Sequence, residues 1–175
     1  DTVPEGLRVT LDGNEQYEDV DAVVDLWEAM EAEPALQRLC AATLFIEQPI
    51  KRAKVFATSV ELLARLKPLI IDESDGELAS FPTALKLGYS GVSSKNCKGL
   101  YKSILNAARV AHLNAKAGAQ NHFMSAEDLT TLAGVSVQQD LTLVSLLGLT
   151  HVERNGHHFV DGMSFASGRE QAAFA

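Results

Sequence analysis

Hydrophobic residues recur along this chain with two alternating periods. Short apolar runs are followed by longer segments in which apolar residues return at helical spacing. The short runs predict six strands, at LRVTL, ATLFI, PLII, SGVSS, AQNHFMS and LTHVE. The predicted strands end near Asp12, Glu47, Asp72, Lys95, Ser125 and Glu153.

The segments between these strands are predicted to be helical. The expected helices lie within residues 19–32, 59–66, 81–88, 101–118 and 126–148. Glycine ends two of them, at Gly88 and Gly118, as is common at helix C-termini. The segment NGHHFV, after the last strand, is predicted to be a turn and a short extension. Strands that alternate with helices, without hairpin spacing, indicate a parallel sheet with helical crossovers.

The spacing of the strand ends favours a barrel. Successive ends lie roughly 25 residues apart, with a longer first step, and a (β/α) barrel uses about 250 residues for eight such units. The alternative is an open, doubly wound sheet. The segment LDGNEQY after the first strand lacks the Gly-rich pattern that binds phosphates in many such sheets.

Composition excludes several classes of protein. The 175 residues suit one domain, and 46% hydrophobic with 22% charged residues is typical of a soluble globular chain. We expect no membrane segment, because no apolar run approaches the length needed to cross a bilayer. The net charge of −8 argues against a nucleic-acid partner. Cys40 and Cys97 show no metal-ligand spacing, so we expect a reduced, cytoplasmic protein.

Charged residues stand at the ends of four consecutive predicted strands. Asp12, Glu47 and Asp72 end the first three strands and Lys95 ends the fourth. In a parallel barrel all carboxyl ends of strands meet on one face, so these side chains would converge. Carboxylates that lie close together repel one another. A hard divalent cation with oxygen ligands, Mg²⁺ above all, would offset that repulsion.

Each of these residues also has a simpler interpretation. Asp12 with Gly13 is a common turn dipeptide, and Glu47 could be solvated at the start of a loop. Asp72 could cap a helix, and Lys95 could pair with any acidic neighbour. Their repetition at the same end of consecutive strands favours the shared site.

Four motifs resemble, in order, strands three to six of the enolase superfamily, in its mandelate racemase and muconate lactonizing enzyme branch. They are VTLDGNEQY, LFIEQPI, LIIDES and GVSSKNCKG. The resemblance extends over essentially the whole chain and implies a partial TIM-type barrel of about six parallel strands, corresponding to strands three to eight. It also implies that Asp12, Glu47 and Asp72 bind Mg²⁺ and that Lys95 is an acid/base catalyst.

The resemblance also indicates what is absent. The resemblance implies that an N-terminal capping domain and the first two strands are not among these residues, and we expect residues 1–175 to correspond to the C-terminal catalytic barrel portion. We expect the chain to require the rest of the same enzyme, or a companion chain, and to be weakly active or inactive alone. Homo-oligomerisation is an expectation from the resemblance alone.

Later residues are weaker candidates. Glu127 stands where the muconate lactonizing branch often carries a glutamate on the seventh strand, and we include it as catalytic, although it could equally be a helix N-terminal carboxylate. We expect His122 to be structural or to line the substrate. Near the last strand lie His151, Glu153, His157 and His158, which could form a metal site, but the resemblance favours packing or substrate lining.

The resulting hypothesis is an isomerase or lyase that acts on a small carboxylate substrate. In the family, Mg²⁺ binds the substrate carboxylate, a base removes the proton on the adjacent carbon, and the metal stabilises the enediolate. Racemisation, epimerisation, dehydration and cycloisomerisation share this step. One alternative is a non-catalytic enolase-like fragment that binds metal or a partner chain. The other is an open α/β binding domain whose strand-end charges are incidental.

Overall fold

The protein is described here by a computed structural model that covers residue 4, residues 6–128 and residues 131–174. The chain divides into two compact units, Asp1–Val92 and Ser93–Ala175. The boundary between them falls within strand β4 (Gly91–Ser94).

Parallel strands form the centre of the first unit. They are β1 (Val9–Asp12), β2 (Thr43–Glu47), β3 (Leu69–Ile71) and the first residues of β4. Each pairs in parallel with the next in sequence order. Asp12 lies opposite Glu47, and Glu47 lies opposite Ile70. The predicted α/β class with parallel strands in sequence order is confirmed.

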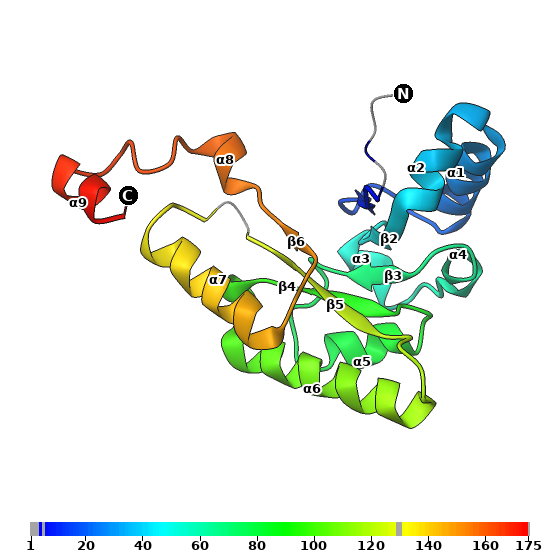
Figure 1. Cartoon of the computed structure of the whole chain (residues 1–175). Helices are drawn as coiled ribbons and strands as arrows, with labels where there is room; N and C mark the ends of the chain where they lie inside the picture. Colours follow the sequence, from blue (N-terminus) through cyan, green and yellow to red (C-terminus); the bar gives the residue numbers. More distant parts are fainter. Residues whose placement is uncertain (1–3, 5, 129–130, 175) are drawn as a thin grey trace. The chain divides into compact units, whose positions relative to one another are not determined.

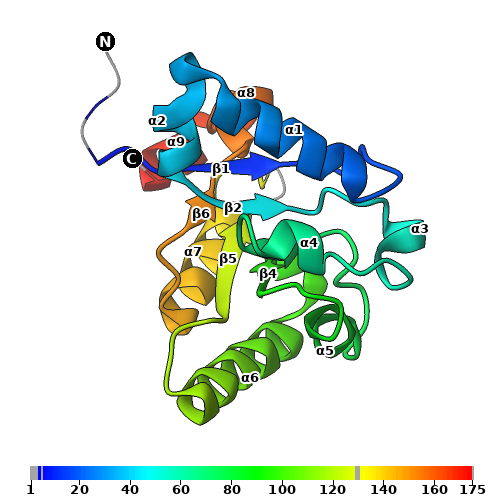
Figure 2. The ribbon, with the colours of Figure 1, turned by 90° about the vertical axis from the view of Figure 1, so that its right-hand side faces the viewer.

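Helices surround these strands. They are α1 (Asp21–Ala32), α2 (Gln37–Ala42), α3 (Arg52–Val55), α4 (Glu61–Ala64) and α5 (Ser80–Leu85), with a 3₁₀ turn at Pro34–Leu36. Helix α1 runs alongside β1 and β2 (Figure 2). It buries Val23 and Trp27, which are four residues apart and therefore share one face. The sequence pattern did not predict α2, because one or two turns are too short to show helical periodicity.

Among its described residues the second unit contains the last two residues of β4, two further strands that pair in parallel, and four helices. The strands are β5 (Phe123–Glu127) and β6 (Val152–Glu153). The helices are α6 (Leu100–Ala117), α7 (Val135–Leu147), α8 (Gly156–Phe159) and α9 (Gly168–Phe174), with a 3₁₀ turn at Asn96–Lys98. Helices α6 and α7 lie side by side (Figure 1). Helix α6 ends at Gly118 as predicted, with the glycine in the left-handed conformation at φ 64°.

Three predictions in the second unit were wrong in detail. The fifth strand ends at Glu127, not near Ser125. The helix expected over 126–148 begins only at Val135, because Gly134 has a φ of 94° that no helix interior contains; residues 129–130 of that prediction lie outside the described residues. Residues 156–159 form the short helix α8 instead of an extension.

No helix in the described part of the chain is long and apolar enough to cross a membrane.

Candidate functional site

Two buried carboxylates lie together at the ends of neighbouring strands in the first unit. Glu47 is the last residue of β2, and Asp72 directly follows β3. Only 4% of Glu47 and 2% of Asp72 is exposed. One carboxylate oxygen of Glu47 lies within 4.8 Å of one from Asp72. Because Glu47 pairs with Ile70 and side chains alternate along a strand, Glu47 and Asp72 lie on the same face.

The chain is held tightly around Glu47. Its carbonyl accepts a hydrogen bond of 2.8 Å from the backbone N–H of Gly13. A side chain at Gly13 would place its Cβ 2.5 Å from the Cα of Pro49, so only glycine fits. The N–H of Tyr17 donates to the Pro49 carbonyl at 3.0 Å. The loops after β1 and β2 therefore continue side by side beyond the strands.

Asp12 lies differently from the other two predicted metal ligands. Its side chain is exposed, and its two carboxylate oxygens accept hydrogen bonds from the backbone N–H and the Nδ2 of Asn14, at 2.8 and 2.7 Å. It occupies the same face of the sheet as Glu47, its partner in the strand register. Each oxygen retains a second lone pair, so the role of Asp12 as a ligand stays a prediction.

Sequence reasoning missed the role of Gln48. Gln48, between Glu47 and Pro49 in the sequence, is fully buried. Its amide bonds to the backbone of Asp72 and to Ser74. The position of an amide side chain directly after a predicted metal ligand could have indicated this role from the sequence.

A buried ion pair lies in the second unit. Lys95, which follows β4, places its Nζ 2.5 Å from Oε2 of Glu127 at the end of β5. Exposure of the two side chains is 6% and 14%. The other oxygen of Glu127 accepts a hydrogen bond of 3.2 Å from Nδ2 of Asn155. The structure thus brings together the two residues that the sequence proposed as catalytic.

Asp128 fixes the chain that follows β6. Its Oδ1 accepts from the N–H of Asn155 at 3.0 Å, and its Oδ2 accepts from the N–H of Gly156 at 3.3 Å. A Cβ at Gly156 would approach the Thr131 carbonyl oxygen to 2.8 Å. Asn155, which contacts Glu127, is therefore held through both its backbone and its side chain.

The histidines are not gathered into a site. Among the described residues, no group of three or more metal-binding side chains contains a histidine. His151, His157 and His158 are exposed. The backbone of His122 is held by Asn114, which donates to its carbonyl at 2.8 Å and accepts from its N–H at 2.9 Å.

Ion pairs join the loops that follow β1 and β2. The guanidinium of Arg52 makes three hydrogen bonds of 2.7, 2.8 and 3.0 Å to the carboxylate of Glu15, which lowers the pKa of Glu15. Lys51 and Lys54 both pair with Glu18, and their hydrogen bonds lower its pKa to about 2. Since Glu18 and both lysines are exposed to solvent, we assign this group to the surface of the protein.

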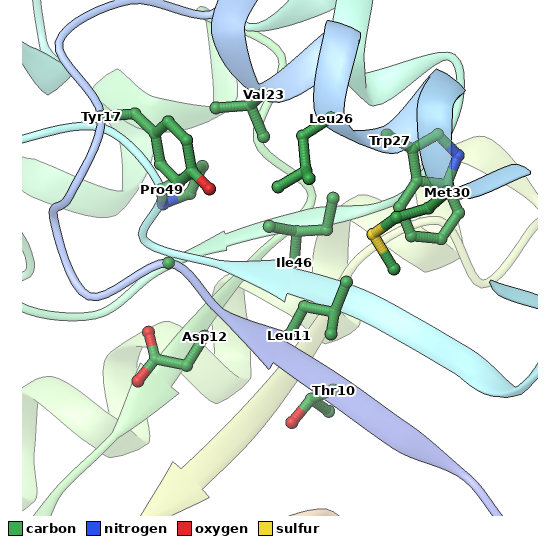
Figure 3. A pocket seen from close by; sticks show the side chains of 11 residues that line it. Thr10, Leu11, Asp12, Tyr17, Val23, Leu26, Trp27, Met30, Ile46 and Pro49 are labelled. Atoms are coloured by element: carbon green, nitrogen blue, oxygen red, sulfur yellow. The ribbon is translucent and has the colours of Figure 1, made fainter. Parts of the chain in front are cut away.

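An apolar pocket of about 260 Å³ lies between α1 and the strands β1 and β2 (Figure 3). Leu26 and Trp27 line it from α1, and Leu11 and Ile46 line it from the strands. Asp12 is at its edge, with the carboxylate directed away from these apolar side chains (Figure 3).

Comparisons with known proteins bear on the fold. An enolase family member from Agrobacterium tumefaciens, with homology to dipeptide epimerases and with bound sodium and L-Ala-L-Glu, is 19% identical, with a TM-score of 0.56 over 85% of this chain. A mandelate racemase/muconate lactonizing protein from Herpetosiphon aurantiacus is 18% identical, with a TM-score of 0.63 over 86% of this chain. The chain has the fold of an enolase-superfamily barrel.

A third solved structure agrees with this result. The o-succinylbenzoate synthase from Thermosynechococcus elongatus, solved with Mg in its active site, is 13% identical, with a TM-score of 0.61 over 98% of this chain. This chain spans 40% of the length of each of the first two proteins and 50% of the third. No protein-family profile matches the sequence, and no curated protein matches it. The predicted partial TIM-type barrel is confirmed.

Proposed function

We propose that this chain is the barrel portion of a Mg²⁺-dependent enzyme that removes a proton from the carbon next to a carboxylate. The observation that carries the proposal is the buried pair of Glu47 and Asp72 at the ends of adjacent parallel strands, with oxygens within 4.8 Å. Active sites in barrels of this type are built at that end of the strands.

The two carboxylates fit a hard cation. Both offer oxygen donors, which Mg²⁺ prefers, and Mg²⁺ commonly binds through one or two carboxylates while it keeps several waters. Two like charges this close and this buried repel each other, so a cation between them lowers the energy of the folded protein. Asp12 is our proposed third ligand, from its place opposite Glu47. When bound, Mg²⁺ would supply positive charge next to the carboxylate of the substrate.

We assign the proton transfer to Lys95 and Glu127. In the ion pair, Lys95 is an ammonium ion, which is its acid form. To act as a base, it must first release a proton, and Oε2 of Glu127 at 2.5 Å is an acceptor within reach. The hydrogen bond from Asn155 holds the other oxygen of Glu127, so the acceptor keeps its orientation.

The substrate class we propose is a small organic carboxylate. One protein with this fold contains L-Ala-L-Glu and is described as similar to dipeptide epimerases, and another is a synthase with Mg in its active site. Because the chain spans 40 to 50% of these proteins, we also propose that a further part of the same enzyme or a companion chain completes the substrate site. Racemase, epimerase, dehydratase and cycloisomerase outcomes all begin with the proposed step.

The test is exchange of the substrate α-proton in heavy water. The full-length protein is incubated with Mg²⁺ and a panel of dipeptides and 2-substituted carboxylates, and deuterium uptake is followed by mass spectrometry. We expect exchange that requires Mg²⁺ and that falls by about 10²- to 10⁴-fold in Lys95→Ala.

Lys116→Ala is the matched control, because Lys116 is an exposed lysine on α6. It should exchange like the wild type. Exchange in Lys95→Ala within threefold of the wild type would exclude Lys95 as the base. A protein that binds Mg²⁺ but exchanges no α-proton on any carboxylate would support a non-catalytic, metal-binding function instead.

A further inference from the structure

We infer that Gln48 is a positioning residue that sets the relative placement of Glu47 and Asp72. This inference rests on the proposed function, since it concerns the same pair of carboxylates. It adds a residue whose side chain bonds to the backbone of Ile50 and Asp72 and to Ser74, and which would act through them.

The side-chain amide of Gln48 joins the end of β2 to the chain that follows β3. Its Oε1 accepts hydrogen bonds from the N–H of Asp72 at 2.9 Å and from the N–H of Ser74 at 3.3 Å. Its Nε2 donates to Oγ of Ser74 and to the carbonyl of Ile50, each at 2.8 Å. One side chain therefore fixes the backbone of Asp72 and the loop that follows Glu47.

The backbone of Gln48 makes two further connections. Its N–H donates to the carbonyl of Ile70 in β3 at 3.0 Å, and its carbonyl accepts from the N–H of Glu15 at 2.9 Å. Gln48 thus connects the chain at the ends of β1, β2 and β3, the three strands that carry the predicted metal ligands.

The conformation of Gln48 is unusual for its residue type. Its φ is +31°, although residues other than glycine rarely have positive φ. Such strain persists only where surrounding interactions determine the conformation, and it is common beside functional sites. Six hydrogen bonds and full burial hold Gln48 in this conformation.

The chemistry of the position selects an amide. The side chain must accept two N–H groups at one end and donate two hydrogens at the other, which neither a carboxylate nor an ammonium group can do. An amide also adds no charge beside two carboxylates that already repel each other. Ser74 completes the arrangement, because its hydroxyl accepts one hydrogen bond and its N–H donates another to the same side chain.

The test compares Gln48→Met with Thr43→Val in the full-length protein. Methionine matches glutamine in length but makes none of the four side-chain hydrogen bonds. Thr43 is the matched control: it is equally buried, stands at the opposite end of β2, and donates one hydrogen bond to the carbonyl of Leu39. Mn²⁺ serves as the probe for the metal site, since its binding can be followed by electron paramagnetic resonance well below the unfolding temperature.

We expect Gln48→Met to bind Mn²⁺ about 10- to 100-fold more weakly than the wild type, as is typical when a group that orients a metal ligand is removed. The spectrum of the remaining bound Mn²⁺ should change, and the amides of Asp72 and Ser74 should exchange hydrogen faster. Thr43→Val should keep the wild-type Mn²⁺ affinity and spectrum even where it lowers thermal stability.

The outcomes distinguish the positioning role of Gln48 from the proposed metal site. Wild-type Mn²⁺ affinity and spectrum in Gln48→Met would overturn the positioning role and leave the metal site standing. If the wild-type protein itself binds no Mn²⁺, the proposed function fails, and the inference fails with it.

Discussion

The two units of this protein hold their buried charged residues in different ways. In the first unit, Glu47 and Asp72 stand on backbone that is fixed by a neutral amide, Gln48. In the second unit, Lys95 and Glu127 are fixed by an ion pair, and Asp140 pairs with Arg154 in the same manner. The first arrangement places two like charges together, and the second places opposite charges together.

Burial of apolar side chains differs as strongly. Most of the buried hydrophobic residues in the described chain belong to the first unit, among them Trp27, Phe45, Leu69, Ile70 and Phe81. In the second unit, the described residues of this kind are Met124, Ala126 and Leu143. Large apolar side chains on its helices, such as Tyr101 and Leu146, are exposed.

This difference teaches where a carboxylate pair can be tolerated. Two buried carboxylates repel each other, so other interactions must hold them in place. In the first unit, the apolar core and backbone hydrogen bonds do so. A unit with little buried apolar surface depends more on its polar contacts. Substitutions in the two units should therefore act by different mechanisms.

The largest effect on stability is expected from the core of the first unit. Ile70→Ala removes a fully buried side chain from β3 and should lower the free energy of unfolding by about 2–5 kcal/mol. The control is Leu141→Ala on α7, whose side chain is 48% exposed and whose replacement should cost less than about 0.5 kcal/mol. Urea denaturation measures both. Equal losses of unfolding free energy in the two variants would contradict the difference in apolar burial between the two units.

The next effect is expected from the ion pair in the second unit. Glu127→Gln removes the carboxylate beside the Lys95 ammonium and should cost about 3 kcal/mol, because buried charges are strongly destabilised when an opposite charge is lost. Glu153→Gln is the matched control, since Glu153 lies opposite Glu127 in β6 and is exposed. A similar, small loss of stability in both variants would show that the pair contributes little.

A smaller effect is expected where the loops after β1 and β2 approach each other. Gly13→Ala would place Cβ 2.5 Å from the Cα of Pro49 and should cost about 1–3 kcal/mol through forced backbone shifts. Gly76→Ala is its control, because a Cβ there has no neighbour within 4 Å. Thermal unfolding of both variants measures the difference. An unchanged thermal stability in Gly13→Ala would mean that the two loops can separate freely.

The smallest effect is expected from the ion pair of the half-buried Glu15 with the exposed Arg52. Glu15→Gln should cost about 0.5 kcal/mol at pH 7. Because Arg52 lowers the pKa of Glu15 from 4.5, the pair stabilises the folded state above that value, and the contribution is lost as pH falls through the lower pKa of the folded protein. The difference between wild type and variant should therefore vanish in acid. Glu28→Gln, at an exposed carboxylate on α1, should show no such difference at either pH. A difference that grows in acid would reverse the predicted sign.

The sequence predicted the features that depend on local pattern. Alternation of apolar runs predicted that Glu47 and Asp72 end two strands; Glu47 is the last residue of β2, and Asp72 directly follows the last residue of β3. The end of β5 was missed because AQNHFMS mixes polar and apolar residues, and only the burial of Met124, Ser125 and Ala126 reveals the strand.

Features that depend on distant partners were not predicted. The side chain of Gln48 bonds to residues 24 and 26 positions further along the chain, and no local period reports such a contact. The hydrogen bonds of Asp12 to Asn14 are local, by contrast, and the turn propensity of Asp12-Gly13 did point to them. The resemblance to a family proposed Lys95 and Glu127 as catalytic residues, but their contact of 2.5 Å was not predicted.

The most direct test of the central claim is calorimetric titration of Mg²⁺ into the full-length protein and its Asp72→Asn variant, with Glu153→Gln as the control. The account predicts one Mg²⁺ per chain in the wild type and in Glu153→Gln, and at least a tenfold loss of affinity in Asp72→Asn. A wild-type protein that binds no Mg²⁺ at millimolar concentration, or an Asp72→Asn variant that binds it equally well, would contradict the claim that the buried carboxylates form a metal site.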